Sequence, residues 1–303
     1  MTKPSTIRFY LEPPLRKSAE EGRHNFIGKM AGVLEKAGYQ AVFETPGMLG
    51  ALPNRGRSLS HMKPPPDHEG LVFRRAYHYP FWQIEQTEKR WSWDTALSSF
   101  DPEHSPRKEA EHFYAFWQKR LFVGAVEQSE RAGFVYVPLQ GRLLEHRSFQ
   151  ACSPIEMLHH CLVHEPNRQI IAALHPKENY TATEVDAIEA LAAQHPRLEV
   201  IMGNMQALLK SCDYVVTQNS SAAFNGYFFG KPALLFAQVD FHHIAVAADL
   251  HNLSQSFAEM ENHAPNYAAY IHWFWQDQCI NAGREDAEEK IAARLKRFGW
   301  PVG

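Results

Sequence analysis

Two adjacent serines occur where a predicted strand turns into a predicted helix. They are Ser220 and Ser221, in the segment YVVTQNSSAAFNGYFFGKP from Tyr214 to Pro232. Backbone N–H groups at a helix N-terminus lack internal partners and lie at the positive end of the helix dipole, so a phosphate there gains hydrogen bonds and charge stabilisation. Asn219 is predicted to cap this helix, the serine hydroxyls add donors, and Lys231 lies in the turn to the next strand. The segment therefore predicts an anion-binding site.

A histidine lies where a second strand of the same run ends. Residues Gln169 to Leu174 (QIIAAL) read as a strand, and His175-Pro176 follows directly. Ligands of an open α/β sheet bind beyond the carboxyl ends of its strands. Proline cannot extend the strand ladder, so this histidine is expected to present its imidazole to a ligand there. Each pattern alone is common, whereas the two together within one run of alternating strands and helices indicate a shared site.

The composition is that of an ordinary globular protein. The 303 residues are enough for two domains, since a domain commonly has ~100–200 residues. Apolar residues make up 45% of the chain and charged residues 21%, which argues against a disordered chain. The formal net charge of −3 gives no electrostatic case for a nucleic-acid partner.

The cysteines and histidines do not form a recognised metal motif. The four cysteines lack CxxC spacing, which excludes a zinc knuckle and a disulfide framework and predicts buried free thiols. His160 and His164 are spaced to share one face of a predicted helix, but no acidic residue or third histidine falls at a recognised spacing. Neither a metal site nor a cofactor is predicted.

The predicted location is the cytoplasm. The start, MTKPSTIRFYLEPP, lacks a cationic segment followed by a long apolar one. No window approaches the ~18 apolar residues of a membrane-spanning helix. A predicted helix from Arg284 to Phe298 carries basic residues on its polar side. It could rest peripherally on the inner membrane, or it could pack back across the domains.

The first half opens with a β-α-β pattern. Ile7 to Leu11 reads as a strand followed by a Pro-Pro loop, Phe26 to Lys36 as a helix, and Tyr39 to Glu44 as the next strand. This order predicts a parallel sheet with a right-handed crossover. Asn25 precedes the helix on the carboxyl side of the first strand, where ligand contacts are expected.

Further along, a long polar segment precedes an aromatic region. Pro46 to Pro66 is rich in Gly, Pro, Arg and Ser and reads as a loop or a mobile lid, because loops longer than ~12–15 residues are usually functional or disordered. Arg74 and Arg75 follow an apolar strand and could grip an acidic group together with His78, although a solvated strand end is an equal interpretation. The aromatic helix from Pro106 to Glu130 could stack sugars or belong to the core.

Five strands alternate with helices in the second half. The strands read FVYVPLQ, QIIAAL, LEVIMG, YVVTQ and PALLFA, and the helices between them include Pro154 to His164 and Thr181 to Gln194. This alternation predicts a Rossmann-like domain. We therefore predict an N-terminal Rossmann-like, acceptor-side domain over residues 1–133, a C-terminal Rossmann-like, nucleotide-sugar domain over 134–264, and helices over 265–303 that pack across the two.

The runs VPLQ (Val137 to Gln140), His175-Pro176 and QNSSAAFNGYFFGKPALLF resemble the capsule polysaccharide biosynthesis family, whose characterised members are Kdo transferases. The resemblance covers roughly the C-terminal half. It implies a GT-B-like fold, in which two Rossmann-like domains with parallel sheets face a central cleft. It also implies a CMP-activated acidic sugar as donor and a glycan or glycolipid as acceptor.

The resemblance assigns roles to residues. In the family, the His-Pro and paired-serine motifs hold the CMP phosphate and ribose region. The residues of this chain that match these motifs are His175, Pro176, Ser220 and Ser221. It also implies a catalytic acid after the PLQ strand. There the chain reads GRLLEHRS, without the family's acidic cluster, and Glu145 is its carboxylate.

The remaining candidates complete the predicted site. Gln140 is expected to orient the sugar. Donor contacts are also expected from Asn219 and Lys231. For the acceptor or the sugar carboxylate we expect contacts from Asn25, Arg74, Arg75 and His78.

The predicted chemistry is metal-independent glycosyl transfer. The serines, the helix N-terminus and a protonated His175 would stabilise charge that grows on the phosphate, while Glu145 acts as base or nucleophile. Two alternatives stay open: a UDP-sugar transferase or epimerase of the same architecture, and a degenerate member that binds a glycan or a partner enzyme.

Overall fold

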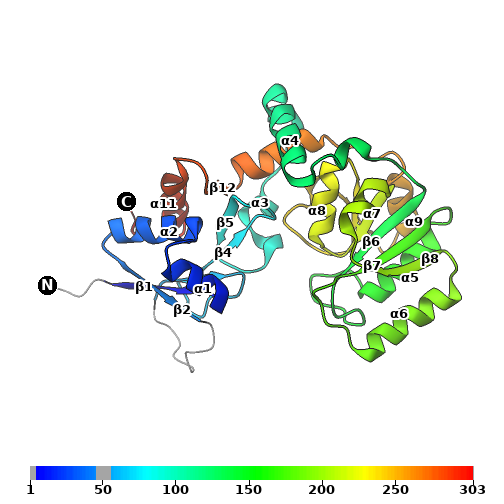
Figure 1. Ribbon diagram of the computed structural model, residues 1–303, viewed down its shortest axis with the longest axis horizontal. Coiled ribbons are helices and arrows are strands. Elements are labelled where there is room, and N and C mark those ends of the chain that lie inside the picture. Colours follow the sequence, from blue (N-terminus) through cyan, green and yellow to red (C-terminus); the bar gives the residue numbers. More distant parts are fainter. Residues whose placement is uncertain (1–4, 46–55, 303) are drawn as a thin grey trace. The chain divides into compact units, whose positions relative to one another are not determined.

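The computed structural model of this protein describes residues 5–45 and 56–302. The chain divides into two compact units (Figure 1). Unit 1 comprises Met1–Ser98 together with Trp273–Gly303, and unit 2 comprises Ser99–His272. Unit 1 is thus built from both ends of the chain. The predicted boundaries after residues 133 and 264 are wrong, since the divisions follow residues 98 and 272.

A six-stranded, mostly parallel sheet forms the centre of unit 1 within its described residues, in the order β12-β5-β4-β3-β1-β2. Its strands are β1 (Thr6–Tyr10), β2 (Gln40–Glu44), β3 (Ser58–His61), β4 (Leu71–Arg75), β5 (Phe81–Glu85) and β12 (Ile280–Asn281). The pairs β1–β2, β1–β3 and β3–β4 are parallel. β5 pairs antiparallel with β4 and β12 pairs antiparallel with β5, so the predicted parallel sheet carries an antiparallel edge. A short turn leads from β4 to β5, and such a turn allows only an antiparallel return.

Part of the predicted Pro46 to Pro66 loop is a strand. Residues 46–55 lie outside the described residues. Residues Ser58–His61 form β3, which inserts between β1 and β4.

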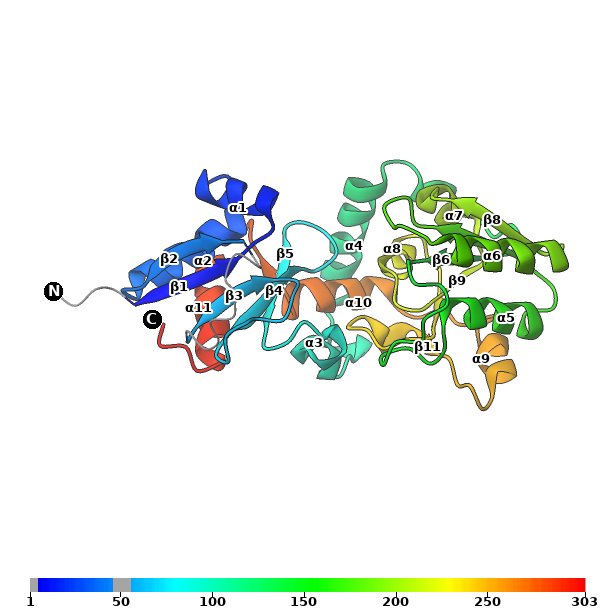
Figure 2. The same cartoon turned by 90° about the horizontal axis from the view of Figure 1, so that it is seen from below.

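Helices cover this sheet and close its core. They are α1 (Pro13–Glu20), α2 (Asn25–Lys36), α3 (Asp94–Leu97), the 3-10 turn Arg90–Ser92, the π-helical turn Trp273–Asp277 and α11 (Ala287–Arg297). α2 and α11 lie side by side (Figures 1 and 2) and bury Ile291 and Leu295 with the first strands. The apolar side of α11 is therefore core: the last helix packs back onto the sheet of the chain's first strands, which is one of its two predicted uses, and its membrane contact stays a prediction.

A helix begins where the sequence predicted a Pro-Pro loop. Pro13 occupies the first position of α1, where the missing N–H of proline has no partner to lose.

Several aromatic side chains of unit 1 belong to its core. Trp82 stacks on Phe26 at 4.8 Å between ring centroids, and Phe81 stacks on Trp275 at 4.4 Å.

Unit 2 contains a second six-stranded sheet among its described residues, in the order β11-β10-β9-β6-β7-β8, and its strands are parallel. They are β6 (Phe134–Leu139), β7 (Gln169–Leu174), β8 (Leu198–Met202), β9 (Tyr214–Thr217), β10 (Ala233–Leu235) and β11 (Val246–Ala247). The five predicted strands are confirmed. Val135, Ile170 and Val216 are completely buried, as expected of a sheet covered on both faces.

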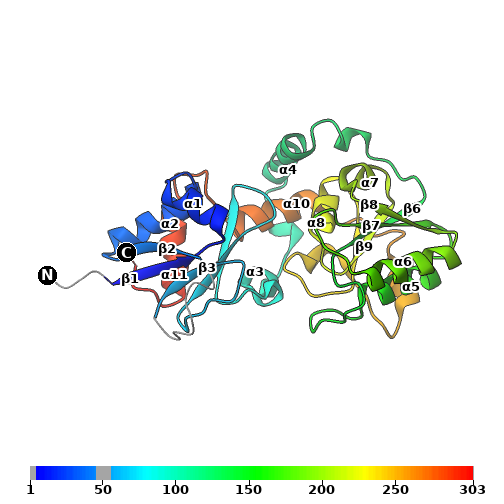
Figure 3. The same ribbon diagram turned by 60° about the horizontal axis from the view of Figure 1, so that its bottom comes forward.

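The helices of unit 2 form a layer on each face of this sheet. They are α4 (Arg107–Phe122), α5 (Pro154–His164), α6 (Ala182–Gln194), α7 (Met205–Ser211), α8 (Ser221–Phe228), α9 (Leu253–Glu259) and α10 (Tyr267–His272), with 3-10 turns at Pro102–His104, Val126–Gln128 and His242–Ile244. Figure 3 shows α5 and α6 on one face and α7 and α8 on the other. Ser153 and Thr181 begin α5 and α6 with capping boxes, which accounts for the accuracy of their predicted starts.

The aromatic helix α4 belongs to unit 2, although the sequence placed it in the N-terminal domain. It packs against α10, and two of its side chains donate hydrogen bonds to carbonyls in the last turn of α8. The Tyr114 hydroxyl donates to Tyr227 O at 2.5 Å, and Gln118 Nε2 donates to Phe228 O at 2.7 Å. These contacts bridge more than a hundred residues of sequence, so local patterns could not reveal them.

The four cysteines are buried free thiols, as predicted. Burial raises the pKa of Cys152 and of Cys212 to about 12, so these thiols stay protonated. None of the described helices is long and apolar enough to cross a membrane.

Candidate functional site

The carboxyl edge of the unit 2 sheet contains a topological switch point between β6 and β9. From β6 the chain proceeds to β7 and β8 on one side, and then returns to β9, β10 and β11 on the other side. Connections on opposite faces leave a crevice outside the carboxyl ends of the two central strands, and ligands of open α/β sheets bind there. Gln140 follows β6 and Ser220 follows shortly after β9, so both flank this switch point.

Ser220, not Asn219, caps the helix that follows β9. The Ser220 Oγ accepts a hydrogen bond from the N–H of Ala222 at 3.2 Å, and α8 begins at Ser221. Asn219 lies one residue too early, and its side-chain amide donates to Gln238 O at 3.5 Å. The Ser220 hydroxyl hydrogen is not used in the cap, and Ser221 is exposed. The predicted hydroxyl pair therefore stands at a helix N-terminus.

Gln218 is a further polar residue at this edge that the sequence did not single out. Its side chain is buried, and Nε2 donates to Cys152 O at 3.0 Å. Its Oε1 has no hydrogen-bond partner among the described residues. A buried acceptor without a donor is costly. At a switch point it is consistent with a donor supplied by a ligand.

His175 is exposed at the end of β7, and its tautomer is set by the backbone. The N–H of Lys177 donates to His175 Nδ1 at 3.2 Å, and the N–H of His175 donates to the Tyr180 hydroxyl at 2.8 Å. With Nδ1 accepting, a neutral ring carries its proton on Nε2 and can donate from there to an anion. Pro176 is also exposed and approaches Gly203 after β8.

The two motifs are not on neighbouring strands. β6 lies between β7 and β9, so the ends of β7 and β9 are two strand spacings apart, or about 10 Å. The half-buried Gln140 lies at the end of the strand between them. His175, Gln140 and the serines follow one another along the sheet edge. The distance from His175 to the serines is therefore larger than a single phosphate group.

A glycine after Gln140 brings a second carboxylate close to the end of β6. A Cβ atom at Gly141 would lie 2.8 Å from Glu178 Oε2, so the Glu178 carboxylate approaches this glycine closely. Glu178 is part of the same turn as His175-Pro176 and was not among the predicted site residues. The available signal was the position of Glu178 in the sequence HPKE, two residues after the His175-Pro176 pair.

Glu145 lies in the loop that follows β6, with its side chain 56% exposed. It pairs with Arg142 at 3.1 Å, a surface pair that leaves the carboxylate accessible. Glu184 holds this loop, because it accepts a hydrogen bond from the N–H of Leu143 at 2.5 Å. Hydrogen bonds from Thr181 and the loop backbone lower the pKa of Glu184, so this anchor is ionised at neutral pH.

Lys231 is not part of this edge, which corrects its predicted donor contact. It precedes β10, and its ammonium donates to the carbonyl of Glu130, which precedes β6. In a parallel sheet both positions lie at the amino edge, opposite the carboxyl ends. Lys231 is 3% exposed, and its burial lowers the pKa of the ammonium group.

The unit 1 candidates lie around the carboxyl ends of its parallel strands. Asn25 is the first residue of α2 and is tied down, because its Nδ2 donates to the Tyr79 hydroxyl at 3.1 Å and to Ala282 O at 2.9 Å. Arg74 and Arg75 end β4, with Arg75 exposed and Arg74 half-buried. His78 lies in the following turn.

The predicted acceptor residues therefore differ in availability. His78 packs edge-on against Trp275 at 5.9 Å. The amide of Asn25 has structural partners, so Arg75 is the more accessible of these candidates.

Two further residues at this edge were missed. Glu12 lies two residues after the end of β1 and His61 ends β3, and Glu12 Oε2 lies 2.9 Å from His61 Nδ1. A signal existed for Glu12, because it follows the predicted strand Ile7 to Leu11. None existed for His61, whose segment was interpreted as a loop.

The histidine clusters do not assemble a metal site in the part of the chain that the structure describes. His160 and His164 do share a helix face, with ring centroids 6.0 Å apart. His164 Nδ1 lies 3.1 Å from Ser254 Oγ. No three His, Cys, Asp or Glu residues between 5 and 45 or between 56 and 302 are grouped to hold a metal ion.

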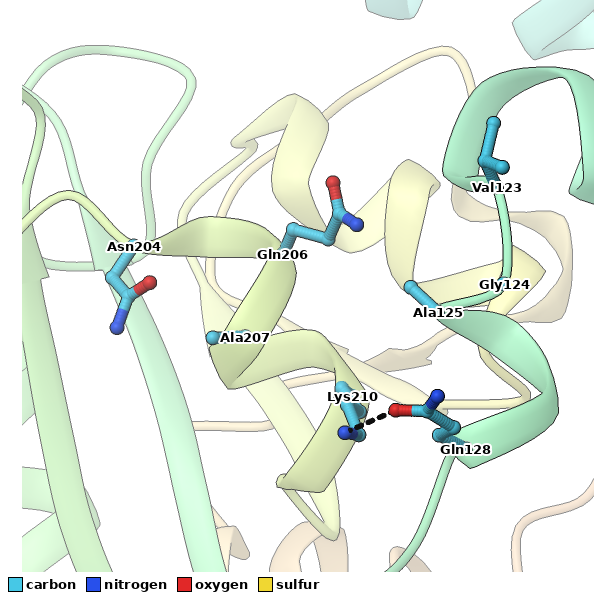
Figure 4. A pocket seen from close by; sticks show the side chains of 8 residues that line it. All are labelled: Val123, Gly124, Ala125, Gln128, Asn204, Gln206, Ala207 and Lys210. Carbon is cyan, nitrogen blue, oxygen red and sulfur yellow. Dashed lines mark hydrogen bonds between the residues drawn. The ribbon is translucent and has the colours of Figure 1, made fainter.

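A pocket beside α7 is separate from all of these residues (Figure 4). Its volume is about 480 Å³, and one wall is α7 with Asn204 while the other is the segment that follows α4. Lys210 donates to Gln128 Oε1 at 2.7 Å across it. The pocket contains neither a free anion-binding cation nor a carboxylate among its lining residues, and it does not suit the predicted chemistry.

Comparison with solved structures supports the fold. Thermosulfurimonas dismutans KpsC, beta Kdo 2,7 transferase, is 11% identical, with a TM-score of 0.52 and coverage of 88% of each chain. T. dismutans KpsC, beta Kdo 2,4 transferase, is 12% identical, with a TM-score of 0.49 over 88% of this chain and 89% of that one. The S. aureus MnaA-UDP co-structure is 13% identical, with a TM-score of 0.37 over 97% and 96%. The first similarity supports the predicted GT-B-like fold of two α/β units. Comparison with curated protein sequences gives no match.

The sequence also matches a family model described as capsule polysaccharide biosynthesis protein, over residues 107–284. The match spans more than half of the chain. It contains β6, the His175-Pro176 turn and the serine pair before α8. The chain therefore belongs to the capsule polysaccharide biosynthesis family.

Proposed function

We propose that this protein is a glycosyltransferase that moves Kdo or a related ulosonic acid from a CMP-activated donor to a glycan or glycolipid acceptor in capsule synthesis. The observation that carries the proposal is the carboxyl edge of unit 2. There the Ser220–Ser221 helix start and His175 flank the end of β6, beside the switch point. Family membership supports the biosynthetic context.

Each group at this edge has a role in the proposed reaction. The start of α8 and the Ser221 hydroxyl bind the phosphate of CMP, and the Ser220 hydroxyl donates a second hydrogen bond. His175 donates from Nε2 and stabilises the charge that develops as the phosphate leaves. Gln140 lies between them and orients the sugar. No metal ion or cofactor takes part in the proposed step.

Carboxylates near β6 act on the sugar. Glu145 is the proposed catalytic carboxylate, on the loop that Glu184 anchors. Arg75 provides the charge for an acidic sugar or acceptor at the edge of unit 1, with Arg74, Asn25 and His78 in the same region.

Nucleotide protection tests the proposal. CMP at about 100 times its dissociation constant adds roughly 2.7 kcal/mol to the free energy of unfolding, so the melting temperature rises with CMP concentration. His175→Ala and Ser221→Ala remove anion contacts and are expected to weaken CMP binding by tenfold or more, which is about 1.4 kcal/mol.

His195→Ala is a matched control for the His175 variant. His195 is also followed by a proline, but it precedes β8 and so lies at the opposite edge of the sheet. It should bind CMP like the wild type. Protection by UDP and not by CMP would show that the donor is a UDP sugar and not a CMP sugar. No protection by either nucleotide, or equal losses in both His variants, would remove the proposed donor site.

A further inference from the structure

Two buried glutamines of unit 2 each have one amide atom without a hydrogen-bond partner in the part of the chain that the structure describes. Gln218 is 5% exposed, and its Oε1 lacks a donor. Gln150 is 6% exposed, and its Nε2 lacks an acceptor. Such buried groups are rare, because each costs the free energy of removing it from water. One of the two atoms is an acceptor and the other is a donor.

The two glutamines lie on adjoining backbone segments, where β9 leaves the sheet of unit 2. Phe236 directly follows β10 and links these segments. Its N–H donates to Thr217 O at the end of β9, and its carbonyl accepts the N–H of Ala151 at 2.7 Å. Gln218 is the chain neighbour of Thr217, and Gln150 is the chain neighbour of Ala151. Both side chains therefore start from one place at the carboxyl edge.

Each amide is held in one orientation by the atom that does have a partner. Gln218 Nε2 donates to Cys152 O at 3.0 Å, so its oxygen points away from that carbonyl. Gln150 Oε1 accepts the N–H of Arg147 at 2.7 Å, so its NH₂ group points away from that N–H. Neither amide can exchange its oxygen and nitrogen without losing this bond. The positions left for a ligand are therefore an acceptor at Gln218 and a donor at Gln150.

An acceptor beside a donor matches the edge of a cytosine base. Cytosine has an exocyclic amino group, which only donates, and next to it a ring nitrogen that only accepts. Uracil has a carbonyl oxygen in place of the amino group and a hydrogen on the ring nitrogen, so its pattern is reversed. An amide fixed in one orientation cannot adapt to this reversal. A ligand that leaves buried polar groups unpaired is strongly disfavoured.

The two amides are also close to the proposed phosphate site. Gln218 precedes Ser220, the cap of α8, by two residues, which is at most about 7 Å of chain. A nucleotide whose phosphate binds at the start of α8 therefore has its base in the neighbourhood of Gln218. All of these groups belong to unit 2.

We propose that Gln218 and Gln150 select the base of the donor nucleotide. Gln218 Oε1 accepts a hydrogen bond from the amino group of cytosine, and Gln150 Nε2 donates to the adjacent ring nitrogen. Both atoms are covered in the structure, so the base reaches them after a local movement of the loops that carry them. The inference rests on the proposed transferase function and names the residues that distinguish a CMP donor from a UDP donor.

Nucleotide binding to the wild type tests the base contact. Calorimetry measures the affinities of CMP, UMP and the CMP analogue in which hydrogen replaces the amino group. CMP is expected to bind ~10-fold or more tightly than either of the other two, as for the loss of one base contact. Equal affinities overturn the inference. So does a loss of affinity with 2′-deoxy-CMP and none with the analogue, because Gln218 would then accept from the ribose.

Substitution of each glutamine tests the residues. Gln218→Leu and Gln150→Leu are each expected to weaken CMP binding by about tenfold and to change UMP binding by less than threefold. The matched control is Gln169→Leu, since this exposed glutamine begins β7 at the opposite edge of the sheet. It should keep the wild-type preference for CMP. A preference that survives both test substitutions overturns the inference.

Two outcomes separate this inference from the proposed function. Absence of CMP binding to the wild type would overturn the proposed function. Binding of CMP without preference over UMP would overturn the base selection alone. If a variant fails to fold, the comparison of CMP with its analogue in the wild type still decides the question.

Discussion

Glu145 and Glu178 are two carboxylates near the end of β6, and they differ in their surroundings. Glu145 is on the loop that the family resemblance points to, and it pairs with Arg142 at the surface. Glu178 comes from the His175 turn and approaches Gly141. The charges of both carboxylates act on Arg147, so the two lie in one neighbourhood. Either could approach the anomeric carbon of a bound sugar.

Substitution of each carboxylate distinguishes them. Glu145→Gln is expected to lower kcat by ~100-fold or more if Glu145 is catalytic. Glu178→Gln serves as its matched control and should retain kcat within a few fold. The measurement is sugar transfer from CMP-Kdo under saturating donor, with CMP binding measured in parallel. A reversed result would move the catalytic role to Glu178.

The sequence predicted the hydroxyl pair, His175 and Gln140 at one sheet edge because each directly follows a strand. It could not predict Glu178 beside Gly141, since this contact depends on how two turns approach each other in space. Lys231 was assigned wrongly for a related reason. A Gly-Lys-Pro turn reads as polar and exposed, whereas tertiary packing buries the lysine against the carbonyl of Glu130.

At the scale of elements, strong end signals gave accurate predictions. α5 has the predicted bounds and a capping box at Ser153, and β7 ends at the predicted residue before His175-Pro176. α4 was predicted to reach Glu130 but ends at Phe122, because Gly124 adopts a φ of 73° that an α-helix cannot contain. β3 was missed, since four residues with two serines carry little strand signal.

An ion-pair network joins three elements of unit 1. Arg294 of α11 bonds to Glu85 of β5 at 2.5 Å and to Asp94 of α3 at 2.6 Å. Burial and the charge of Asp94 raise the pKa of Glu85 from 4.5 to about 7, against the opposing effect of Arg294. The carboxyl group is thus buried at a cost that depends on pH.

Glu85 should make the stability of unit 1 depend on pH. Its pKa is raised from 4.5 to about 7 on folding, so between these values the folded protein binds more protons than the unfolded chain. Its stabilising contribution is present below pH 4.5 and is lost as pH rises through about 7. The difference in unfolding free energy between wild type and Glu85→Gln should therefore fall over this range, by up to roughly 3 kcal/mol.

Denaturant unfolding of both proteins at several pH values checks this effect. Glu288→Gln is a suitable control, because Glu288 is on α11, the same helix as Arg294, and pairs with Lys36 at the surface. A difference between wild type and Glu85→Gln that does not change with pH would show that Glu85 has the same pKa in both states.

At the scale of the whole molecule, the two units differ in how the chain builds them. Unit 2 is one continuous segment, Ser99–His272, with its own core between the sheet and α5, α6 and α9. Unit 1 needs both ends of the chain. Its core includes Ala287, Ile291 and Leu295 of α11, together with Trp300 and Val302 beyond it. The sequence predicted that the C-terminal helices pack back across the domains, but its patterns could not show that α11 completes the core of the first sheet.

This difference predicts how fragments behave. Residues 99–272 expressed alone should fold cooperatively and retain CMP protection, because the fragment keeps the whole sheet of unit 2 and the carboxyl edge with His175 and Ser220. Residues 1–98 alone should not fold. They lack β12 and α11, and Phe26, Ile84 and the first strands would expose the surface that Ile291 and Leu295 cover. Each lost large aliphatic side chain costs about 2–5 kcal/mol, and several are lost together.

Circular dichroism and amide-proton NMR dispersion measure both outcomes. The control is residues 1–98 supplied with residues 273–303 as a separate peptide, which should restore dispersed signals because the missing core side chains return. Well-dispersed spectra from residues 1–98 alone would contradict the role of α11 in the core. A disordered fragment 99–272 would contradict the independence of unit 2, since nothing in its sheet or in the cluster around α5, α6 and α9 comes from outside that segment.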